Sequence, residues 1–216
     1  MTRNVSFQDY AIVACGTLSM ELNHLRESGR LDARIILYTK PGRHEVPLEL
    51  ENQLIKQIKT AKTYASNIIV VYGGKFCYIN ADDPYRKIDT IINEQAEPGV
   101  RISRIKATHC IDMLASEEER QQICQEQNVY WLTPGWMKYR QHVFQGWDKG
   151  LANENFPRHT GGAMMLDAVG FFDEMMQNNP EEILEFSDWM GIPMGPCPVT
   201  VDRLLGLLSD EVKADK

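Results

Sequence analysis

The sequence contains no run of Lys and Arg residues and no apolar stretch that approaches the roughly 18 residues of a membrane span. Its first ten residues lack the apolar core of a secretory signal peptide. The formal net charge is −7, opposite in sign to the basic surfaces that bind nucleic acids. These absences argue against a nucleic-acid or membrane partner, and we expect a cytoplasmic protein.

The five cysteines form no Cys-x-x-Cys pair, and their odd number cannot make a complete set of disulfides. Thiols stay reduced in the cytoplasm, so we expect each cysteine to be inert, catalytic or metal-binding. The complete Gly-x-Gly-x-x-Gly fingerprint and the Walker lysine are also missing. Neither of these two nucleotide-binding motifs is therefore predicted.

What is present fits one soluble domain: 216 residues, of which 43% are hydrophobic and 25% charged. Over residues 10–150, short apolar runs alternate with amphipathic segments, which is typical of a parallel sheet covered by helices. We predict a single α/β domain over 1–216, with a mainly parallel, roughly five-stranded Rossmann or flavodoxin-like sheet. The expected strands are residues 10–14, 33–38, 67–72, 100–107 and 129–132. The expected helices between them are residues 17–27, 47–63, 84–94, 117–126 and 138–145.

The last third of the chain, residues 151–210, has a different pattern and is expected to be a helical extension of the same domain. Its apolar segment 163–176 predicts a helix, and Asn179-Pro180-Glu181-Glu182 predicts the start of another. Residues 191–198 contain three prolines, which indicates a turn-rich crossing before a final helix over 201–208.

Three cysteines, Cys15, Cys77 and Cys110, each follow an apolar run that predicts a strand. In a flavodoxin-like strand order these thiols would converge at the carboxyl edge of the sheet, where such folds bind ligands. Three thiolates suit a zinc ion or an iron–sulfur cluster. The alternative is that each thiol is a small buried hydrophobic group. Cys124 is expected to be structural, and nothing in the sequence places Cys197.

Three histidines follow or flank these strands. His44 lies in the loop after the second expected strand and is a candidate fourth ligand or general base, or else an exposed loop residue. If the fourth strand continues to Cys110, His109 points to the opposite face, which favours Cys110 as the ligand. Asp112 could orient a ligand or cap the next helix. His159 lies in a polar loop that is either a lid over the site or a connector.

Glycines and aromatic residues lie at the same expected edge. Gly16 begins a tight turn from strand to helix, and Gly73-Gly74-Lys75 offers backbone amides and one cation. Both segments are candidate cofactor sites for a carboxylate or phosphate group. Trp136, in Thr133-Pro134-Gly135-Trp136, is placed to line a pocket.

Five of these motifs together resemble a bacterial and archaeal family catalogued as domain of unknown function 1638, over about residues 10–208. They are Ala14-Cys15-Gly16, His44, Gly73-x-x-x-Cys77, His109-Cys110-Ile111-Asp112-Met113-Leu114 and Leu132-Thr133-Pro134-Gly135-Trp136. Relatives in that family often occur beside corrinoid-dependent methyltransferases for methylated amines. The resemblance therefore implies a link to methyl-transfer metabolism and a corrinoid protein or methyltransferase as partner.

These observations leave three hypotheses open. The first is a metal- or iron–sulfur-binding protein with Cys15, Cys77 and Cys110 as ligands, acting in corrinoid-linked methyl transfer. The second is a metal-free module that binds or senses a small molecule. The third is an enzyme with a cysteine nucleophile activated by His44 or His159.

Overall fold

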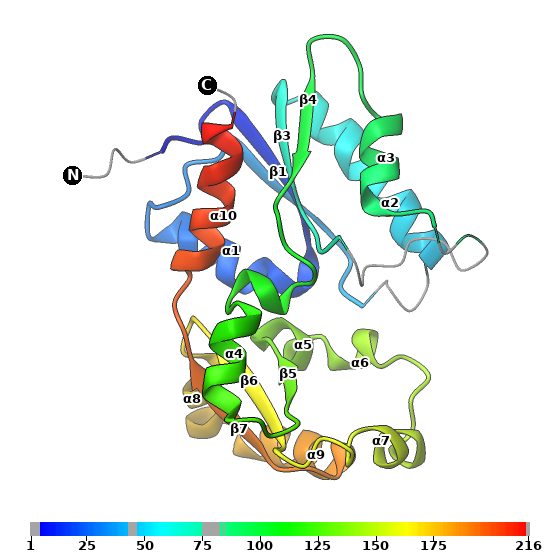
Figure 1. The fold of residues 1–216 in the computed structure, drawn as a ribbon, viewed down its shortest axis with the longest axis vertical. Helices are drawn as coiled ribbons and strands as arrows, with labels where there is room; N and C mark the ends of the chain where they lie inside the picture. The colour runs from blue at the N-terminus through cyan, green and yellow to red at the C-terminus, as the bar shows by residue number, and fades with distance from the viewer. Residues whose placement is uncertain (1–4, 43–46, 75–82, 84, 215–216) are drawn as a thin grey trace.

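The computed structural model describes residues 5–42, 47–74, 83 and 85–214. These residues form two lobes, each built on its own parallel sheet (Figure 1). The first sheet has the strand order β2-β1-β3-β4 and the second the order β5-β6-β7. Among the helices of the described residues, none is both long and apolar enough to cross a lipid bilayer.

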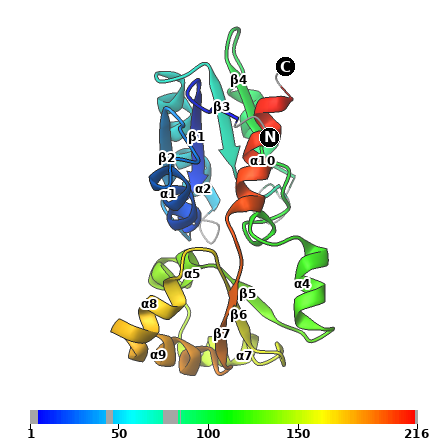
Figure 2. The ribbon, with the colours of Figure 1, turned by 90° about the vertical axis from the view of Figure 1, so that its left-hand side faces the viewer.

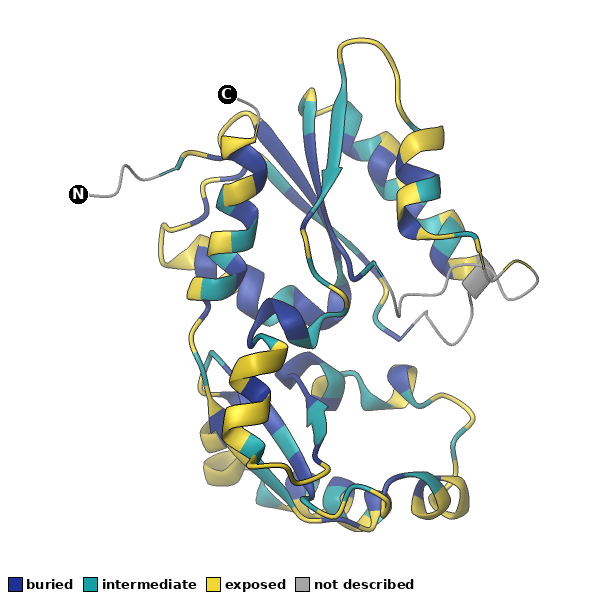
Figure 3. Cartoon of the chain, viewed as in Figure 1, coloured by how far each residue is buried: buried dark blue, intermediate teal, exposed yellow. Residues whose placement is uncertain are grey.

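The first lobe is a four-stranded sheet covered by helices on both faces. Its central strands β1 and β3 are buried throughout most of their length, as expected for strands with helices on each side (Figure 3). Helices α1 and α10 pack on one face, and α2 and α3 pack on the other (Figure 2). The strands are β1 (Tyr10–Cys15), β2 (Ile35–Thr39), β3 (Asn67–Val71) and β4 (Arg101–Arg104). The helices are α1 (Ser19–Glu27), α2 (Pro47–Lys62), α3 (Ile88–Glu94) and α10 (Asp202–Lys213), with the short 3-10 helix η1 (Gly16–Leu18) before α1.

The second lobe is smaller and has a core rich in aromatic rings on one face of its sheet. Its strands are β5 (Tyr130–Leu132), β6 (Ala163–Asp167) and β7 (Met194–Pro198). Its helices are α5 (Pro134–Lys138), α6 (Arg140–Val143), α7 (Lys149–Asn155), α8 (Phe171–Asn178) and α9 (Pro180–Met190). Between the lobes the chain forms the 3-10 helix η3 (Ile111–Met113) and helix α4 (Glu117–Cys124). After β7 the chain returns to the first lobe as α10 (Figure 2).

The predicted α/β class, the parallel strands and the C-terminal helix are confirmed. So is the flavodoxin-like order of the first four strands, but the fifth expected strand opens a second sheet instead of joining the first. The reason lies in β4, whose sequence Arg101-Ile102-Ser103-Arg104 is half-buried along its whole length. A short strand with two arginines is typical of a sheet edge that does not pair further.

The prediction of one helix over 163–176 is wrong in its first part, because the extension over 151–210 contributes two strands besides its helices. Residues 163–167 form β6, and the helix starts only at Phe171, after Gly170 with a φ of 75°. A short apolar run such as Ala163–Asp167 has no periodicity that separates a strand from a buried helix. Residues 194–198 form β7, which pairs with β6 alone, and this edge position accommodates Pro196 and Pro198.

The two lobes meet where α5 packs on η1 and α1. Gly135 in α5 lies so close to η1 that an added Cβ would fall 1.9 Å from the carbonyl oxygen of Thr17. Met20 of α1 packs against the aromatic core of the second lobe. The hydroxyls of Ser19 and Tyr139 add a weak hydrogen bond of 3.4 Å across the same contact. Backbone approach thus fixes the second lobe to the start of α1.

Glu21 lies next to Met20 on α1 and is fully buried. Neither of its carboxyl oxygens has a hydrogen-bond partner among the described residues. Burial, with a smaller contribution from the carboxylate of Asp167, raises the pKa of Glu21 to about 8. The side chain is therefore a neutral acid at neutral pH, since an unpaired buried charge would be far more costly.

We predict that Glu21→Gln stabilises the protein increasingly as the pH rises. Above pH 4.5 the unfolded chain ionises at Glu21 while the folded chain keeps the proton, so stability falls until the pH passes about 8. This linkage amounts to about 1.4 kcal/mol per pH unit, and we expect a gain of about 2–4 kcal/mol for the variant at pH 8. Urea denaturation at pH 5 and pH 8 measures the difference in the free energy of unfolding between the variant and the unmodified protein.

The matched control is Glu27→Gln, an exposed position on the same helix, for which we expect a change within about 0.5 kcal/mol at both pH values. A gain for Glu21→Gln that is the same at pH 5 and pH 8 would contradict the assignment of a buried neutral acid.

Candidate functional site

A cavity of about 330 Å³ lies between the lobes, at the carboxyl ends of β1 and β3. This is the edge at which open α/β sheets bind ligands. We call it the inter-lobe cavity. The first lobe contributes Cys15, Thr17, Leu18, Val71, Tyr72 and Gly73, together with the segment after β4, His109, Cys110, Ile111 and Met113. The remaining lining residues are Arg120 of α4 and Tyr130, Trp131 and Trp136 of the second lobe.

Cys15 is the last residue of β1, and its side chain borders the cavity. Burial raises the pKa of the Cys15 thiol, and hydrogen bonds with Thr17 and Tyr72 offset this only in part. The Cys15 Sγ lies 3.1 Å from the Thr17 Oγ1, and the Tyr72 hydroxyl also bonds the Thr39 hydroxyl. Thr39, Tyr72, Cys15 and Thr17 thus form one chain of neutral polar groups, in which the thiol keeps its proton at neutral pH.

His109 and Cys110 both line the cavity, contrary to the expectation that they point to opposite faces. That expectation requires a strand up to Cys110, but β4 ends at Arg104. Cys110 has helical dihedral angles (φ −60°, ψ −35°) at the start of η3. The alternation of side chains therefore stops before these residues, and the turn presents both of them to the same space.

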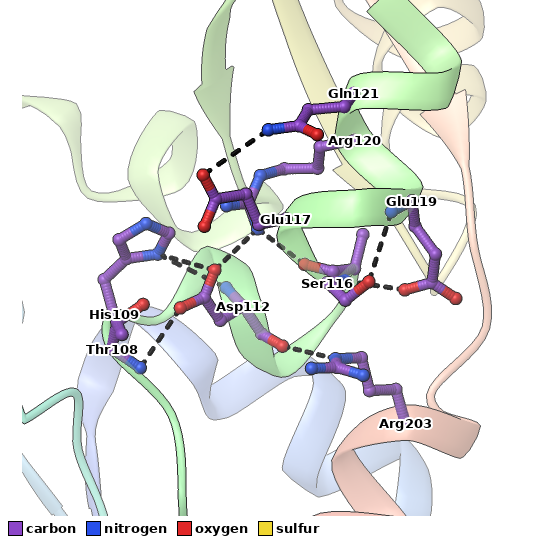
Figure 4. A network of polar contacts seen from close by, with 10 residues as sticks. Thr108, His109, Asp112, Ser116, Glu117, Glu119, Arg120, Gln121 and Arg203 are labelled. Carbon is purple, nitrogen blue, oxygen red and sulfur yellow. Dashed lines mark hydrogen bonds and ion pairs between the residues drawn. The ribbon is translucent and has the colours of Figure 1, made fainter.

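Asp112 organises the wall behind His109 (Figure 4). Its Oδ2 accepts a 3.1 Å hydrogen bond from the Thr108 N–H, and its Oδ1 accepts one of 2.7 Å from the Arg120 Nη1. The Arg203 Nε of α10 donates to the Asp112 carbonyl oxygen at 2.5 Å. The Asp112 carboxylate thus connects the segment after β4 with α4. The backbone carbonyl of Asp112 connects the same segment with α10. Asp112 therefore orients its neighbours and does not itself line the cavity.

The Asp112 N–H donates to the His109 Nδ1 at 3.3 Å, so the proton of the neutral ring lies on Nε2. Burial lowers the pKa of His109; Asp112 and Glu117 oppose this shift and Arg120 adds to it. The imidazole is therefore neutral at neutral pH.

The second lobe closes the cavity with aromatic rings. Tyr130 and Trp136 meet edge to face, with ring centroids 6.4 Å apart. The prediction that Trp136 lines a pocket is confirmed. Trp131 also borders the cavity, in addition to packing in the small core formed by Leu114, Leu166 and Cys197.

The three candidate glycines have packing roles. A Cβ on Gly16 would lie 2.6 Å from the Thr39 carbonyl oxygen, and one on Gly73 would lie 2.5 Å from the His109 Cα. A Cβ on Gly74 would meet the Arg104 guanidinium. Close approach of neighbouring loops therefore accounts for glycine at these positions, and of the three only Gly73 lines the cavity.

The other candidate residues lie elsewhere. His44, Lys75 and Cys77 fall outside the described residues. His159 lies at the far end of β5, where its Nδ1 is 3.0 Å from the Asn128 Oδ1 and its ring packs on Tyr130. It does not line the cavity. Cys124 is half-buried on α4, and Cys197 is buried in the small core on Leu166. The described residues contain no group of three His, Cys, Asp or Glu side chains placed to hold a metal ion.

Sequence reasoning missed Arg120, Tyr72 and Thr17. Arg120 follows three glutamates, Glu117, Glu118 and Glu119, and this run of charges indicates a solvated helix face. In the structure Arg120 is only 8% exposed. Tyr72 ends the predicted strand 67–72, and Thr17 starts the helix predicted after strand 10–14. These positions at the strand ends could have identified both residues. No comparable local signal exists for Arg120, because its position depends on hydrogen bonds to Asp112 and to the Ala115 carbonyl, outside its own helix.

Fold and site together define a two-lobed α/β protein with a cavity between two parallel sheets. A family model described as Protein of unknown function (DUF1638) matches residues 38–208, so the chain belongs to this family. This confirms the resemblance seen in the motifs. Neither the curated proteins nor the solved structures include one that matches the chain.

We predict that Gly73→Ala destabilises the protein by about 1–3 kcal/mol, because its Cβ would overlap the backbone at Thr108 and His109. The matched control is Gly206→Ala in α10, where a Cβ meets open space and a gain of about 0.5–1 kcal/mol is expected. Equilibrium unfolding in urea compares the two. Equal effects of the two substitutions would contradict the packing role of Gly73.

Proposed function

We propose that the protein binds a small organic molecule with a flat, apolar body in the inter-lobe cavity. The observation that carries this proposal is the enclosure of the cavity by apolar and aromatic side chains from both lobes. Its volume of about 330 Å³ falls at the lower end of the range for ligand pockets, about 300–1,000 Å³.

The lining explains the expected shape of the ligand. Tyr130, Trp131 and Trp136 bring three rings from the second lobe, opposite Val71 and Tyr72 at the end of β3. Aromatic walls stabilise flat ligands through stacking and edge-to-face contacts. The few polar groups, such as the Cys15 thiol and the His109 imidazole, would fix the orientation of the ligand.

This proposal is favoured over a nucleophilic role for Cys15. A cysteine nucleophile needs a lowered pKa, and burial raises the pKa of Cys15. His159, one of the two expected activating bases, does not line the cavity. A neutral thiol bonded to Thr17 instead acts as a polar contact in a binding wall.

We expect small uncharged aromatic compounds such as indole, phenol and benzyl alcohol to raise the melting temperature. Binding to the folded state alone adds about 2.7 kcal/mol at a ligand concentration of 100 times Kd. Ile111→Trp, which fills the cavity, should abolish the shift. Ile123→Trp, at an exposed position of α4, should preserve it. Circular dichroism follows the thermal unfolding. The absence of a shift with these three compounds and with the aromatic acid benzoate would refute the proposal.

We propose as a second candidate a metal or iron–sulfur centre held by Cys15, Cys77 and Cys110. The supporting observation is that Cys15 and Cys110 line the same cavity, while Cys77 follows β3, the strand between β1 and β4. Burial raises the pKa of Cys15, so a metal ion that binds there would have to displace the proton of the thiol into solvent. The corrinoid-linked methyl transfer implied by the family resemblance stays a prediction.

The metal candidate predicts about one equivalent of zinc, or a stoichiometric iron–sulfur cluster, in protein purified without oxygen. The double variant Cys15→Ser/Cys110→Ser should lose the metal, whereas Cys124→Ser, outside the cavity, should retain it. Elemental analysis measures both. Less than about 0.2 equivalents in the unmodified protein would refute this candidate, given the affinity of thiolate sites.

A further inference from the structure

The permanent charge in the described lining of the inter-lobe cavity is of one sign, positive. Of the described residues that line it, Arg120 is the one with a permanently charged side chain, and no described Asp or Glu belongs to the lining. His109 is neutral, because burial lowers its pKa. The rest of the wall is mostly apolar, and a charge in such surroundings interacts more strongly than one in water.

The counter-ion of Arg120 lies behind the wall. Asp112 accepts from the Arg120 Nη1 at 2.7 Å, and its second oxygen is held by the Thr108 N–H (Figure 4). Asp112 does not line the cavity, whereas Arg120 does. Glu117, which acts on His109 from the first turn of α4, is exposed and is also not part of the lining. Of these three charged side chains, Arg120 is thus the one in the described lining of the cavity.

The hydrogen bonds of Arg120 leave one edge of the guanidinium open. Both recorded bonds use Nη1, one to Asp112 and one of 2.6 Å to the Ala115 carbonyl oxygen. Within the described part of the chain no bond is recorded for Nε or Nη2, and neither atom is among the fully buried polar atoms that lack a partner. Both atoms therefore keep some exposed surface, on a residue that lines the cavity. An Nε–Nη2 edge matches the two oxygens of a carboxylate.

We propose that the ligand of the inter-lobe cavity is a small apolar or aromatic monocarboxylate, and that the Nε–Nη2 edge of Arg120 binds its carboxylate. This inference rests on the small-molecule function proposed above and specifies its ligand class. Asp112 already pairs with Nη1, so Arg120 offers a ligand one donor edge, which suits a single carboxylate. A dianion such as a phosphate ester would bring a second charge into a wall whose described residues supply no further permanent cation. Asp112 is a positioning residue that holds the guanidinium in place.

Benzoate and benzamide provide matched probes, because they share the ring and differ in the charged group. Isothermal titration at pH 7 should show that benzoate binds at least about tenfold more tightly, equivalent to about 1.4 kcal/mol. The double variant Arg120→Met/Asp112→Asn removes both partners without leaving a buried charge unpaired. It should lose the preference for benzoate. Arg140→Gln, which removes an ion pair with Glu182 outside the cavity, should keep it.

A second variant covers the case in which the double variant does not fold. Arg120→Lys keeps the charge beside Asp112 but loses the planar fork, so benzoate should bind at least about threefold more weakly while benzamide is unaffected. Equal affinity of the unmodified protein for both probes would overturn the inference while the small-molecule function stands. So would a benzoate preference that survives in the double variant, or one that Arg120→Lys leaves undiminished. No binding of either probe, together with no response to indole, phenol and benzyl alcohol, would overturn both.

Discussion

The arrangement of the two lobes depends on one backbone contact, between Gly135 at the start of α5 and the carbonyl of Thr17 in η1. There is no room for a Cβ at this position, so the second lobe can approach the carboxyl edge of the first sheet only with glycine there. The return of the chain through α10, whose apolar face packs on the first sheet, holds the lobes together at a second place. The cavity exists because these two connections leave space between them.

The interface beside this contact contains polar groups that a simple apolar core would lack. Glu21 is buried without a partner, and Cys15, Thr17, Thr39 and Tyr72 bond one another at the edge of the cavity. Each of these groups is neutral or hydrogen-bonded in a way that avoids an isolated charge. Arg120 is the charged group of this region, and its charge is paired with the carboxylate of Asp112 behind the cavity wall. An unpaired buried acid at Glu21 and a paired cation at Arg120 are thus the two departures from an apolar interior in this region.

Local signals predict the first lobe well. Strands β1, β2 and β3 are largely apolar runs, and right-handed crossovers restrict the strand order, so β2-β1-β3-β4 follows from sequence. The capping box at Ser116 and Glu119 and the proline at the start of α9 are likewise local and correct. The last two strands of the second lobe lack such signals. Its β7 contains two prolines, and its β6 is five residues long, so their pairing is decided by tertiary contacts that the sequence pattern does not encode.

The same distinction applies to the site. Cys15, Cys110, Gly73 and Trp136 were accessible to prediction because each follows a strand, and strand ends converge on one edge of a parallel sheet. Arg120 is different: it stands among glutamates and glutamines on a polar helix. Its position in the wall arises only because Asp112, eight residues earlier, and the Ala115 carbonyl turn its guanidinium inward. The Cys15 thiol, which is conspicuous in the sequence, is thus a neutral group at the cavity, while an inconspicuous arginine supplies a charge.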